Sequence, residues 1–362
     1  MKEFPNDVSV TIVAFNALKR LPSTVEALIS AGCPPGRITV VDNGSTDGCA
    51  EWVQTCWPAI CVRRLDVNNG PNPGRNAGLK NARTPYVLLL DDDILVEKET
   101  IHTLHCFITS SPEIAITSPM ILHGDQPDLI LYAGTGLHFM CEAVNPWQGR
   151  RVEEYENRPQ EIGCAPGGAM LVSRSAALRV DLFDENYFIG KADGDFSQRI
   201  RLAGYKIVGV PEARALHTGT ARGTHRYYYQ IRNRWYFMLK NYQLQTLLLL
   251  LPALLVHEVL QLAILALKGH TATYFKAMLG LFAMLPKIPE ERAKIAKYRV
   301  VKDREVLQTG PVLVPEDILS QRYVRKGKAV YDKLLQSYWN FLTKVVLKGA
   351  RQSSLRTATS SK

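Results

Sequence analysis

Three consecutive carboxylates, Asp91–Asp93, stand directly after the apolar run Tyr86–Leu90. Like charges in such a row repel one another, so the arrangement is unfavourable unless a cation lies beside it. Carboxylate oxygens suit Mg²⁺ or Mn²⁺, which proteins commonly hold through one or two carboxylates together with phosphate oxygens of a substrate. The segment therefore predicts a divalent-cation site, with a solvated acidic loop as the alternative.

Two earlier loops have residue types that suit a nucleotide. Residues 42–48 (DNGSTDG) place an acid, a glycine and a Ser/Thr helix cap after a β-branched run. A tight turn before a capped helix is the alternative. Residues 69–78 (NGPNPGRNAG) form a Gly/Asn loop that enters a helix, where backbone N–H groups can approach a phosphate or a ribose. This loop matches neither the P-loop nor the dinucleotide fingerprint.

Three later segments add candidate polar groups. The pair Gly167-Gly168 precedes an apolar run, residues 193–195 (DGD) precede a helical run, and His217 follows the strand-like run 206–210. Each has an ordinary structural reading, because an acid at a helix N-terminus is commonly a cap. A lone histidine is likewise more often structural than a ligand. The order of these segments along the chain is more specific than any one of them.

The elements that must position these groups are strand-like and helix-like segments, which alternate over the first ~215 residues. The pattern predicts strands over Val8–Ala14, Ile38–Val41, Cys61–Leu65 and Tyr86–Leu90, and helices over Leu21–Ser30, Cys49–Trp57 and Arg75–Ala82. Such an order is typical of βαβ crossovers in an α/β fold with a mainly parallel sheet. In such sheets the ligand lies outside the carboxyl ends of the strands, which is where the polar loops fall.

Taken in order, these segments resemble glycosyltransferase family 2, whose GT-A fold is a Rossmann-like, mostly parallel sheet with flanking helices. The opening strand with Asn16 is similar to the family's V-x-x-x-x-N start, and residues 42–47 are similar to its D-[DN]-G-S-x-D loop. Residues 69–78 resemble its Gly/Asn segment ending in R-N-x-G, and residues 91–93 its D-x-D. The glycine pair, the DGD segment and His217 resemble its acceptor-side glycines, its E-D-x-D segment and its late metal-binding histidine. The resemblance covers residues 8–242 and looks closest to the rhamnosyltransferase-like bacterial branch.

The resemblance implies an inverting, metal-dependent transfer of a single sugar from a UDP- or dTDP-linked donor, with rhamnose among the candidate sugars. The acceptor would be lipid-linked or a saccharide, in cell-surface polysaccharide synthesis. Asp193 would take the acceptor's proton, and Asp93 and His217 would hold Mg²⁺ or Mn²⁺. The implied nucleotide site consists of Ala14, Phe15, Asn16, Asp42, Ser45, Gly70, Arg75, Asn76, Asp91 and Asp92. The implied acceptor and diphosphate site consists of Gly167, Gly168, Asp195 and Arg232. For Arg75 and Arg232, an equal alternative to a role in binding the diphosphate is a side chain that faces solvent from a helix.

Two segments depart from the family pattern. Ala192 stands where the family has a glutamate before the catalytic aspartate. Gln230, Arg234 and Trp235 only approximate the Q-x-x-R-W motif of processive synthases, with one residue too many, which favours single-sugar transfer. Two alternatives stay open: a nucleotidyltransferase, which would need a Gly-rich loop with Arg and Lys after the first strand, and a non-catalytic nucleotide-sugar binding protein.

Charge divides the chain of 362 residues in two. Residues 1–217 carry 20 basic and 26 acidic side chains, a net of −6, whereas residues 218–362 carry 24 and 8, a net of +16. We therefore expect a catalytic domain at 1–226, with a nucleotide part at about 1–120 and an acceptor part at about 121–226. A basic, apolar and helical membrane-associating region is expected at 227–350, followed by a flexible tail at 351–362.

Composition excludes collagen-like, low-complexity and largely disordered chains, because 46% of the residues are hydrophobic and 22% are charged. Seven scattered cysteines without a C-x-x-C pair fit a reducing compartment better than a zinc site or a disulfide framework. The first seven residues carry acids and a proline, so we expect no secretory signal.

The segment Leu244–Leu267 is almost wholly apolar and long enough to span a bilayer. Its middle is interrupted by Pro252, His257, Glu258 and Gln261, and charged groups at mid-bilayer are costly. A helix lying in the interface of an anionic membrane is therefore favoured over a span, with a buried hairpin of a soluble protein as a third possibility. We expect peripheral attachment to the cytoplasmic face of the cell membrane, and no nucleic-acid partner.

Overall fold

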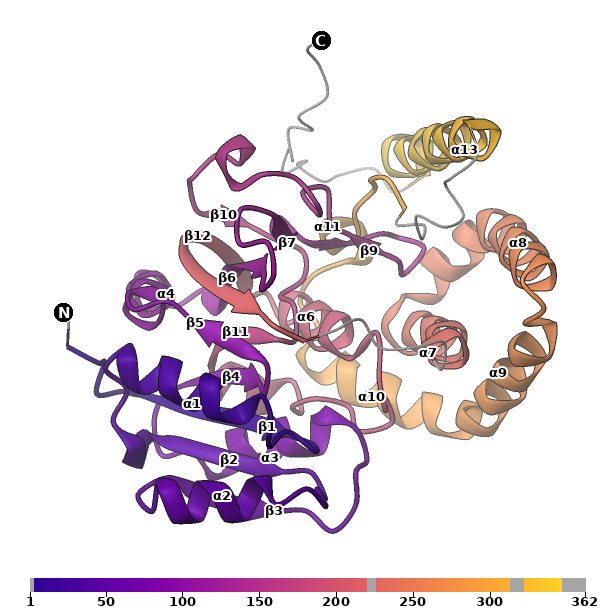
Figure 1. Ribbon diagram of the computed structural model, residues 1–362. Helices are drawn as coiled ribbons and strands as arrows, with labels where there is room; N and C mark the ends of the chain where they lie inside the picture. The colour runs from indigo at the N-terminus through magenta and orange to yellow at the C-terminus, as the bar shows by residue number, and fades with distance from the viewer. Residues whose placement is uncertain (1–2, 220–225, 313–321, 347–362) are drawn as a thin grey trace.

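The computed structural model describes residues 3–219, 226–312 and 322–346 (Figure 1). The tail predicted at 351–362 lies outside these residues. The strands are β1 (Val8–Ala14), β2 (Ile38–Asp42), β3 (Cys61–Arg64), β4 (Tyr86–Asp91), β5 (Ile94–Val96), β6 (Ile114–His123), β7 (Ile130–Tyr132), β8 (Gly136–Leu137), β9 (Ala143–Val144), β10 (Gln160–Glu161), β11 (Ala169–Ser173) and β12 (Lys206–His217). Ten of them form one sheet in the order β10-β12-β6-β11-β4-β1-β2-β3, with β5 paired to β12 and β7 paired to β6. The short strands β8 and β9 pair with each other.

The N-terminal half of the sheet is parallel, as predicted. β1 pairs in parallel with β2 and with β4, and β2 pairs in parallel with β3. The other half is mixed, because β11 runs antiparallel to both β4 and β6 while β12 runs parallel to β6. The mainly parallel sheet that we expected is therefore limited to the half that carries the first three polar loops.

The helices of the N-terminal part cover both faces of the sheet (Figure 1). They are α1 (Leu21–Ser30), α2 (Cys49–Cys56), α3 (Pro71–Asn81), α4 (Thr100–Thr109), α5 (Arg174–Arg179) and α6 (Ala192–Leu202), with 3₁₀ turns at Pro35–Arg37 and Val152–Glu154. Helix α3 begins four residues before the predicted start, because Pro71 occupies a first-turn position whose N–H would have no helical partner.

β4 is buried on both faces, which explains its continuous apolar sequence. Leu88 and Leu90 belong to the hydrophobic cluster of α1, α2 and α4, whereas Val87 and Leu89 belong to the cluster of α5 and α6. The acidic segment Asp91–Asp93 is therefore held at the end of a strand that is buried on both faces.

The C-terminal helices are α7 (Arg226–Asn241), α8 (Leu244–Leu267), α9 (Thr271–Met284), α10 (Ile288–Tyr298), α11 (Asp303–Val306) and α13 (Arg322–Phe341), with a 3₁₀ turn at Leu285–Lys287 and a π-helical turn at Leu342–Val346. α7 buries Tyr236 and Phe237 in the same cluster as Phe196 of α6. Figure 1 shows α8, α9 and α13 at the end of the molecule farthest from β1–β3. The C-terminal helices thus extend the hydrophobic cluster that contains α5 and α6.

Candidate active site

The candidate site lies at the carboxyl ends of β1, β2 and β4. In the strand register, Ala14 pairs with Asp42 and Val13 pairs with Asp91. Because these strands are neighbours and parallel, the loops that follow them meet at one edge of the sheet. The register therefore brings the predicted nucleotide loops and the acidic segment to one place.

Asn16 joins the loop after β1 to the loop after β2. It has a φ of 47°, a left-handed conformation that asparagine tolerates better than most residues. Its backbone N–H donates to Ser45 Oγ at 2.9 Å, and its side-chain oxygen accepts from the Thr46 N–H at 2.9 Å. The buried Asp42 carboxylate accepts from the Ser45 N–H at 3.0 Å. These bonds make the two loops a single wall, beside which the Phe15 ring is 40% exposed.

The three consecutive acids turn toward different partners. Asp91 accepts from Arg75 Nη2 at 2.8 Å. Asp92 accepts from Arg20 Nη2 at 3.0 Å and from the Phe15 N–H at 3.1 Å, and burial raises the pKa of Asp92. Asp92 therefore supports the Phe15 loop from the interior, which does not fit the direct nucleotide contact that we predicted for it.

Asp93 and His217 face each other, with 3.8 Å between Asp93 Oδ1 and His217 Nε2. The strand pairing of β12 with β5 brings them together, because His217 lies opposite Ile94. The Thr218 N–H and hydroxyl also donate to the Asp93 carbonyl, at 2.9 and 3.1 Å. A Cβ on Gly219 would lie 2.0 Å from Asp93 Oδ2, so any larger residue there would displace the Asp93 carboxylate.

A carboxylate and an imidazole at this separation fit two ligands of a Mn²⁺ or Mg²⁺ ion, for which mixed oxygen and nitrogen donors are suitable. Among the residues that the structure describes, no group of three or more His, Cys, Asp or Glu side chains gathers as a complete metal site. Further ligands would therefore come from water or from a bound diphosphate.

Arg75 connects the acidic segment to the glycine pair. Its side chain is 6% exposed, and Nη2 donates both to Asp91 Oδ1 at 2.8 Å and to the Gly167 carbonyl at 2.9 Å. Its guanidinium also lies 5.5 Å from the centre of the Phe183 ring. The solvent-facing alternative for Arg75 is therefore wrong.

Asp193 lies in the first turn of α6, partly exposed, on the other side of the glycine pair. Its Oδ2 accepts from the Gly167 N–H at 3.2 Å and its Oδ1 accepts from the Gly194 N–H at 2.9 Å. Since Gly167 accepts from Arg75 and donates to Asp193, two residues, Arg75 and Gly167, connect Asp91 to the carboxylate on α6. The two ends of the predicted site are thus linked by a continuous chain of hydrogen bonds.

Residues 9–180 match the family model described as "Glycosyl transferase family 2". The chain carries a glycosyltransferase family 2 domain. It is 26% identical, over 232 residues, to the N-acetylglucosaminyl-diphospho-decaprenol L-rhamnosyltransferase of Mycobacterium tuberculosis, a match that covers 58% of this chain and 75% of that protein. It is 28% identical, over 197 residues, to the minor teichoic acid biosynthesis protein GgaB of Bacillus subtilis, covering 52% of this chain and 20% of that protein.

Among solved structures, the glycosyltransferase is similar to the crystal structure of GalNAc-T7 with UDP, GalNAc and Mn²⁺. The TM-score is 0.53 at 20% identity, and the match covers 64% of this chain and 47% of that chain. This likeness confirms the GT-A type of fold. The family match and the relatives, and not this likeness, decide for a glycosyltransferase over the nucleotidyltransferase and the non-catalytic alternatives. The relatives include proteins of cell-wall polysaccharide synthesis.

Asn76 has a different place in the glycosyltransferase from the one we predicted. Its amide donates to the Phe183 carbonyl at 2.9 Å and to Glu185 Oε1 at 2.8 Å, and its oxygen accepts from the Phe183 N–H at 2.9 Å. This buried side chain is fully used in holding the segment after α5, so it does not contact a nucleotide. Gly70 is required for the same packing, since it has a φ of 87° and a Cβ there would lie 2.1 Å from the Phe188 carbonyl oxygen.

Asp195 was predicted at the acceptor site, and this assignment is wrong. Its side chain is completely buried, where it contacts Lys240 Nζ at 2.8 Å, Arg199 Nε at 2.8 Å and Asn241 Nδ2 at 2.8 Å. Although burial alone would raise the pKa of Asp195, Lys240 and Arg199 hold it below its ordinary value. Asp195 therefore fixes α6 to α7 and has no surface to offer to a substrate.

Lys191 is a residue that the sequence reasoning missed. It precedes α6 with a φ of 66°, and its buried side chain donates to the Cys141 carbonyl at 2.5 Å and to Glu142 Oε2 at 2.7 Å. Glu142 Oε1 in turn lies 3.9 Å from Arg234 Nε. A lysine two residues before the predicted base, next to the missing family glutamate at Ala192, was the available signal.

Arg232 lies on α7 among aromatic rings. Its guanidinium is 5.6 Å from the centre of the Tyr228 ring and 5.1 Å from that of Tyr229, and Nη2 donates to the Asn186 carbonyl at 2.9 Å. Tyr229 stacks on Phe188, with 5.3 Å between ring centres. Arg232 is thus half-buried in an aromatic cluster and not on a solvent-facing side of the helix.

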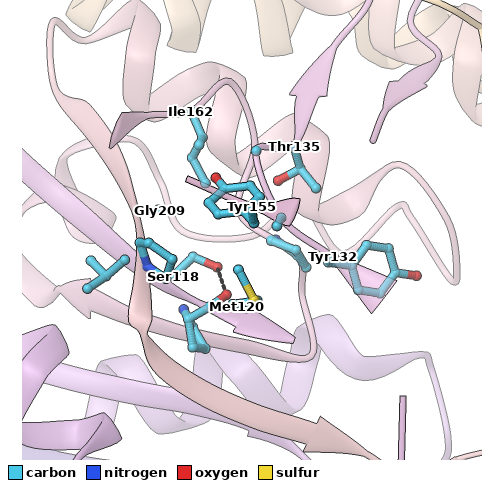
Figure 2. A pocket seen from close by; sticks show the side chains of 13 residues that line it. Ser118, Met120, Tyr132, Thr135, Tyr155, Ile162 and Gly209 are labelled. Carbon is cyan, nitrogen blue, oxygen red and sulfur yellow. Dashed lines mark hydrogen bonds between the residues drawn. The ribbon is translucent and has the colours of Figure 1, made fainter. Parts of the chain in front are cut away.

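A small pocket lies elsewhere, between β6, β12 and the segment around β7 (Figure 2). Figure 2 shows Ser118, Met120, Tyr132 and Tyr155 around it, with the Ser118 hydroxyl donating to the Pro119 carbonyl at 3.4 Å. None of the residues that line it belongs to the predicted nucleotide, acceptor or metal sets. The candidate site is therefore defined by the loops at the carboxyl ends of the strands and not by this pocket.

Proposed function

We propose that this glycosyltransferase transfers a single sugar from a nucleotide diphosphate sugar to an acceptor hydroxyl with inversion at the anomeric carbon. In one displacement, the acceptor oxygen forms a bond to the anomeric carbon while the bond from that carbon to the diphosphate oxygen breaks. The acceptor's proton passes to the Asp193 carboxylate. A single direct displacement with one base inverts the configuration.

The contact chain Asp91–Arg75–Gly167–Asp193 supports this proposal most strongly. It sets the carboxylate at the end of β4 and the carboxylate at the start of α6 on either side of one glycine. Within the described residues, the two oxygens of Asp193 accept from the backbone N–H groups of Gly167 and Gly194, so the carboxylate is fixed and still partly exposed. General bases held in this way contribute roughly 10²- to 10⁴-fold in rate.

The proposed donor site is the part at about 1–120. The wall formed by Asn16, Asp42 and Ser45 binds the base and ribose, with the exposed Phe15 ring beside them. Asp93 and His217 would hold Mg²⁺ or Mn²⁺, which when bound would offset the charge that develops on the leaving diphosphate.

The proposed acceptor site is the part at about 121–226, with Gly167 and Gly168 next to the base, together with Arg232 among the aromatic rings of α7. One relative is named for transfer of L-rhamnose onto a diphospho-decaprenol lipid. We accordingly propose a UDP- or dTDP-linked donor, with rhamnose as the first sugar to test, and a lipid-linked or saccharide acceptor. A lipid-linked acceptor fits an enzyme attached to the cytoplasmic face of the membrane.

The test separates donor binding from transfer. The Asp193→Asn variant keeps the shape of the side chain and loses its basicity, so we expect turnover to fall by at least about 100-fold while the donor Kd stays unchanged. Nucleotide release and product formation are measured over a panel of UDP- and dTDP-sugars with Mg²⁺ or Mn²⁺. The anomeric configuration of the product is then determined by NMR.

The matched control is Asp128→Asn, because Asp128 is an exposed aspartate whose ion pair with Arg151 lies at the surface. This variant should keep both turnover and donor affinity. Equal loss of donor binding and turnover in Asp193→Asn would assign Asp193 to the donor site instead, and a product with retained configuration would refute the single displacement. Full activity after chelation of divalent cations would refute the metal requirement.

A further inference from the structure

We propose that α8, α9 and α13 together form a surface that lies flat on an anionic lipid bilayer, and that α8 does not cross it. This surface, called here the three-helix face, deepens the proposed function by naming the partner that would bring the enzyme to a lipid-linked acceptor. The sequence predicts a membrane-associating region at 227–350 with Leu244–Leu267 as the interfacial helix, and the structure adds which side chains of α9 and α13 continue its apolar surface.

The outward side of α8 is apolar and uncovered. The helix has a mean hydropathy of 2.2 over its most apolar stretch, of which 17% is buried. A core helix of a soluble protein would bury most of these residues. Its exposed large side chains run along its whole length: Leu244, Leu248, Leu251, Leu255, Val256, Val259, Leu260 and Leu267. A continuous apolar surface of this kind marks an interaction site.

The apolar surface continues onto the two neighbouring helices. On α9 the exposed apolar side chains are Phe275, Leu279 and Phe282, and on α13 they are Val330, Leu334 and Phe341. In each helix these residues follow the spacing of one face. α9 is joined to α8 by the Tyr274 hydroxyl, which donates to Glu258 at 2.6 Å. α13 is joined to α8 by the Tyr331 hydroxyl, 2.8 Å from His257 Nδ1.

The polar residues in the middle of α8 point inward. Gln261 accepts from Arg234 at 3.0 Å, and Glu258 accepts from Trp235 Nε1 at 3.0 Å and forms an ion pair with Arg234. His257 is turned toward Tyr331. These residues therefore lie against α7 and α13 and not against the outward apolar side chains.

The inward side of α8 is in contact with the protein from end to end. Its buried residues Thr246, Leu250, Leu254 and Leu265 continue the stripe of the three polar residues along the helix. A span would have to carry the buried charge of Arg234 into the hydrocarbon or break all of these contacts, and either change is costly. A helix packed sideways along its full length and apolar on its other side suits the bilayer interface.

The charges around the face select an anionic surface. The exposed cations are Lys276 on α9 and Arg325, Lys326, Lys333 and Lys344 on or next to α13. The two acids of these helices are neutralised, Glu258 by Arg234 and Asp332 by Lys328 at 2.5 Å. A second copy docked through the same face would set these cations against one another, whereas anionic lipid head groups attract them.

The experiment measures flotation of the full chain with vesicles, in the absence of donor. Vesicles of phosphatidylcholine are compared with vesicles that also contain phosphatidylglycerol. We expect binding to the anionic vesicles, partly reversed by high salt, because charge is screened and apolar burial is not. Val259→Glu should abolish most of this binding. Val300→Glu is the matched control, since Val259 and Val300 are both 68% exposed and Val300 lies outside the three helices.

Two further variants test whether the face extends beyond α8. Leu279→Glu on α9 and Leu334→Glu on α13 should each weaken vesicle binding, and the charge substitutions Lys326→Gln and Lys333→Gln should each lower it about fivefold at low salt. Donor affinity, measured without vesicles, should be unchanged in all of them, which shows that they fold and separates a failure here from a failure of the proposed transfer.

Three outcomes would overturn the proposal. Membrane-bound protein that resists extraction by alkaline carbonate would show that α8 spans the bilayer. A concentration-dependent dimer that Val259→Glu dissociates, without binding to vesicles, would assign the face to a second copy of the chain. Equal vesicle binding by Val259→Glu and Val300→Glu would show that the three-helix face is not the contact.

Discussion

Two parts of the candidate active site are held together by different interactions. In the terms of the proposed function, the loops after β1 and β2 are called the donor wall and helix α6 is called the acceptor wall. On the donor wall, short side chains such as Asn16, Asp42 and Ser45 bond to backbone N–H groups of the neighbouring loop. On the acceptor wall, α6 is fixed by buried charges, with Asp195 between Arg199 and Lys240. The donor wall thus depends on many modest hydrogen bonds, and the acceptor wall on a few fully desolvated ion pairs.

This difference has an energetic consequence. A hydrogen bond to a backbone N–H at a partly exposed loop contributes about 1 kcal/mol, because water can replace a lost partner. A buried ion pair is costly to break, since the remaining charge is left without water or counter-ion. We therefore expect the acceptor wall to fail abruptly when one member is removed and the donor wall to weaken gradually.

The largest effect is expected from Lys240→Met. Lys240 Nζ lies 2.6 Å from Asp184 and 2.8 Å from Asp195, and its side chain is completely buried. Removal of the ammonium leaves the buried Asp184 without this counter-ion and Asp195 with Arg199 alone, so the free energy of unfolding should fall by about 3–5 kcal/mol. Urea denaturation followed by circular dichroism measures this change.

The control for this change is Lys206→Met, because Lys206 pairs with Glu113 at the surface and both side chains are about half exposed. The urea concentration at which half of the Lys206→Met protein is unfolded should equal that of the unmodified chain. Addition of Asp184→Asn to Lys240→Met should recover part of the lost stability, because Asp184 is the carboxylate left without its ammonium partner. Additive losses in the double variant would contradict the ion-pair account.

The next largest effect is a loss of folding stability at low pH. His138 is completely buried on the acceptor side, its Nδ1 accepts from the Met140 N–H at 3.1 Å, and burial lowers the pKa of His138 to about 4. The unfolded chain binds this proton near pH 6.5 and the folded chain does not, so stability is lost as the pH falls from 6.5 to about 4. This histidine alone should account for about 3 kcal/mol of that loss.

His138→Gln isolates the contribution, since an amide oxygen can accept from the Met140 N–H and does not titrate. The free energy of unfolding of the variant should fall less steeply between pH 7 and pH 4 than that of the unmodified chain. Parallel pH dependences of the two proteins would show that His138 is protonated in both the folded and the unfolded state.

The elements of the donor half could be predicted closely from the sequence, because each is a local pattern with its own start and stop. The predicted limits of β1 and α1 agree with the structure, and α8 also has its predicted ends. The mixed half could not be predicted, because antiparallel pairing of β11 with β4 and β6 is a contact between distant segments. Periodicity shows that a segment is a strand and not which strand it will join.

The candidate site shows the same limit. The motif residues on the donor wall and Asp193 come together at one edge of the sheet, because that edge is defined by the strand ends. Asp195 was assigned to the acceptor site and Asn76 to the nucleotide site from their motif positions. These positions do not reveal the contacts that bury them, which come from distant segments, Lys240 for Asp195 and Phe183 for Asn76. Lys191 was missed for the same reason, as its partner Glu142 lies 49 positions away.

Lys191→Gly tests whether Lys191 positions Asp193, the proposed base. Lys191→Gly keeps the left-handed backbone at φ 66° and removes the contacts to Cys141 and Glu142, so turnover should fall about tenfold to 100-fold while the donor Kd is unchanged. Lys191→Ala should show the same kinetic loss and be less stable than the glycine variant by about 1 kcal/mol, because alanine is strained at this φ. Unmodified turnover in Lys191→Gly would leave the side chain with a structural role only.

The smallest effect is expected on the donor wall, from Asn16→Gly. Glycine tolerates the φ of 47° and removes the acceptor of the Thr46 N–H, which water can replace at this exposed loop. We expect a loss of about 1 kcal/mol in the free energy of unfolding, whereas Asn16→Asp, which keeps the acceptor oxygen, should be close to the unmodified chain. Both are measured by urea denaturation beside Lys240→Met. If Asn16→Gly were as damaging as Lys240→Met, the donor wall would depend on single contacts as strongly as the acceptor wall does, and the contrast between the two would be wrong.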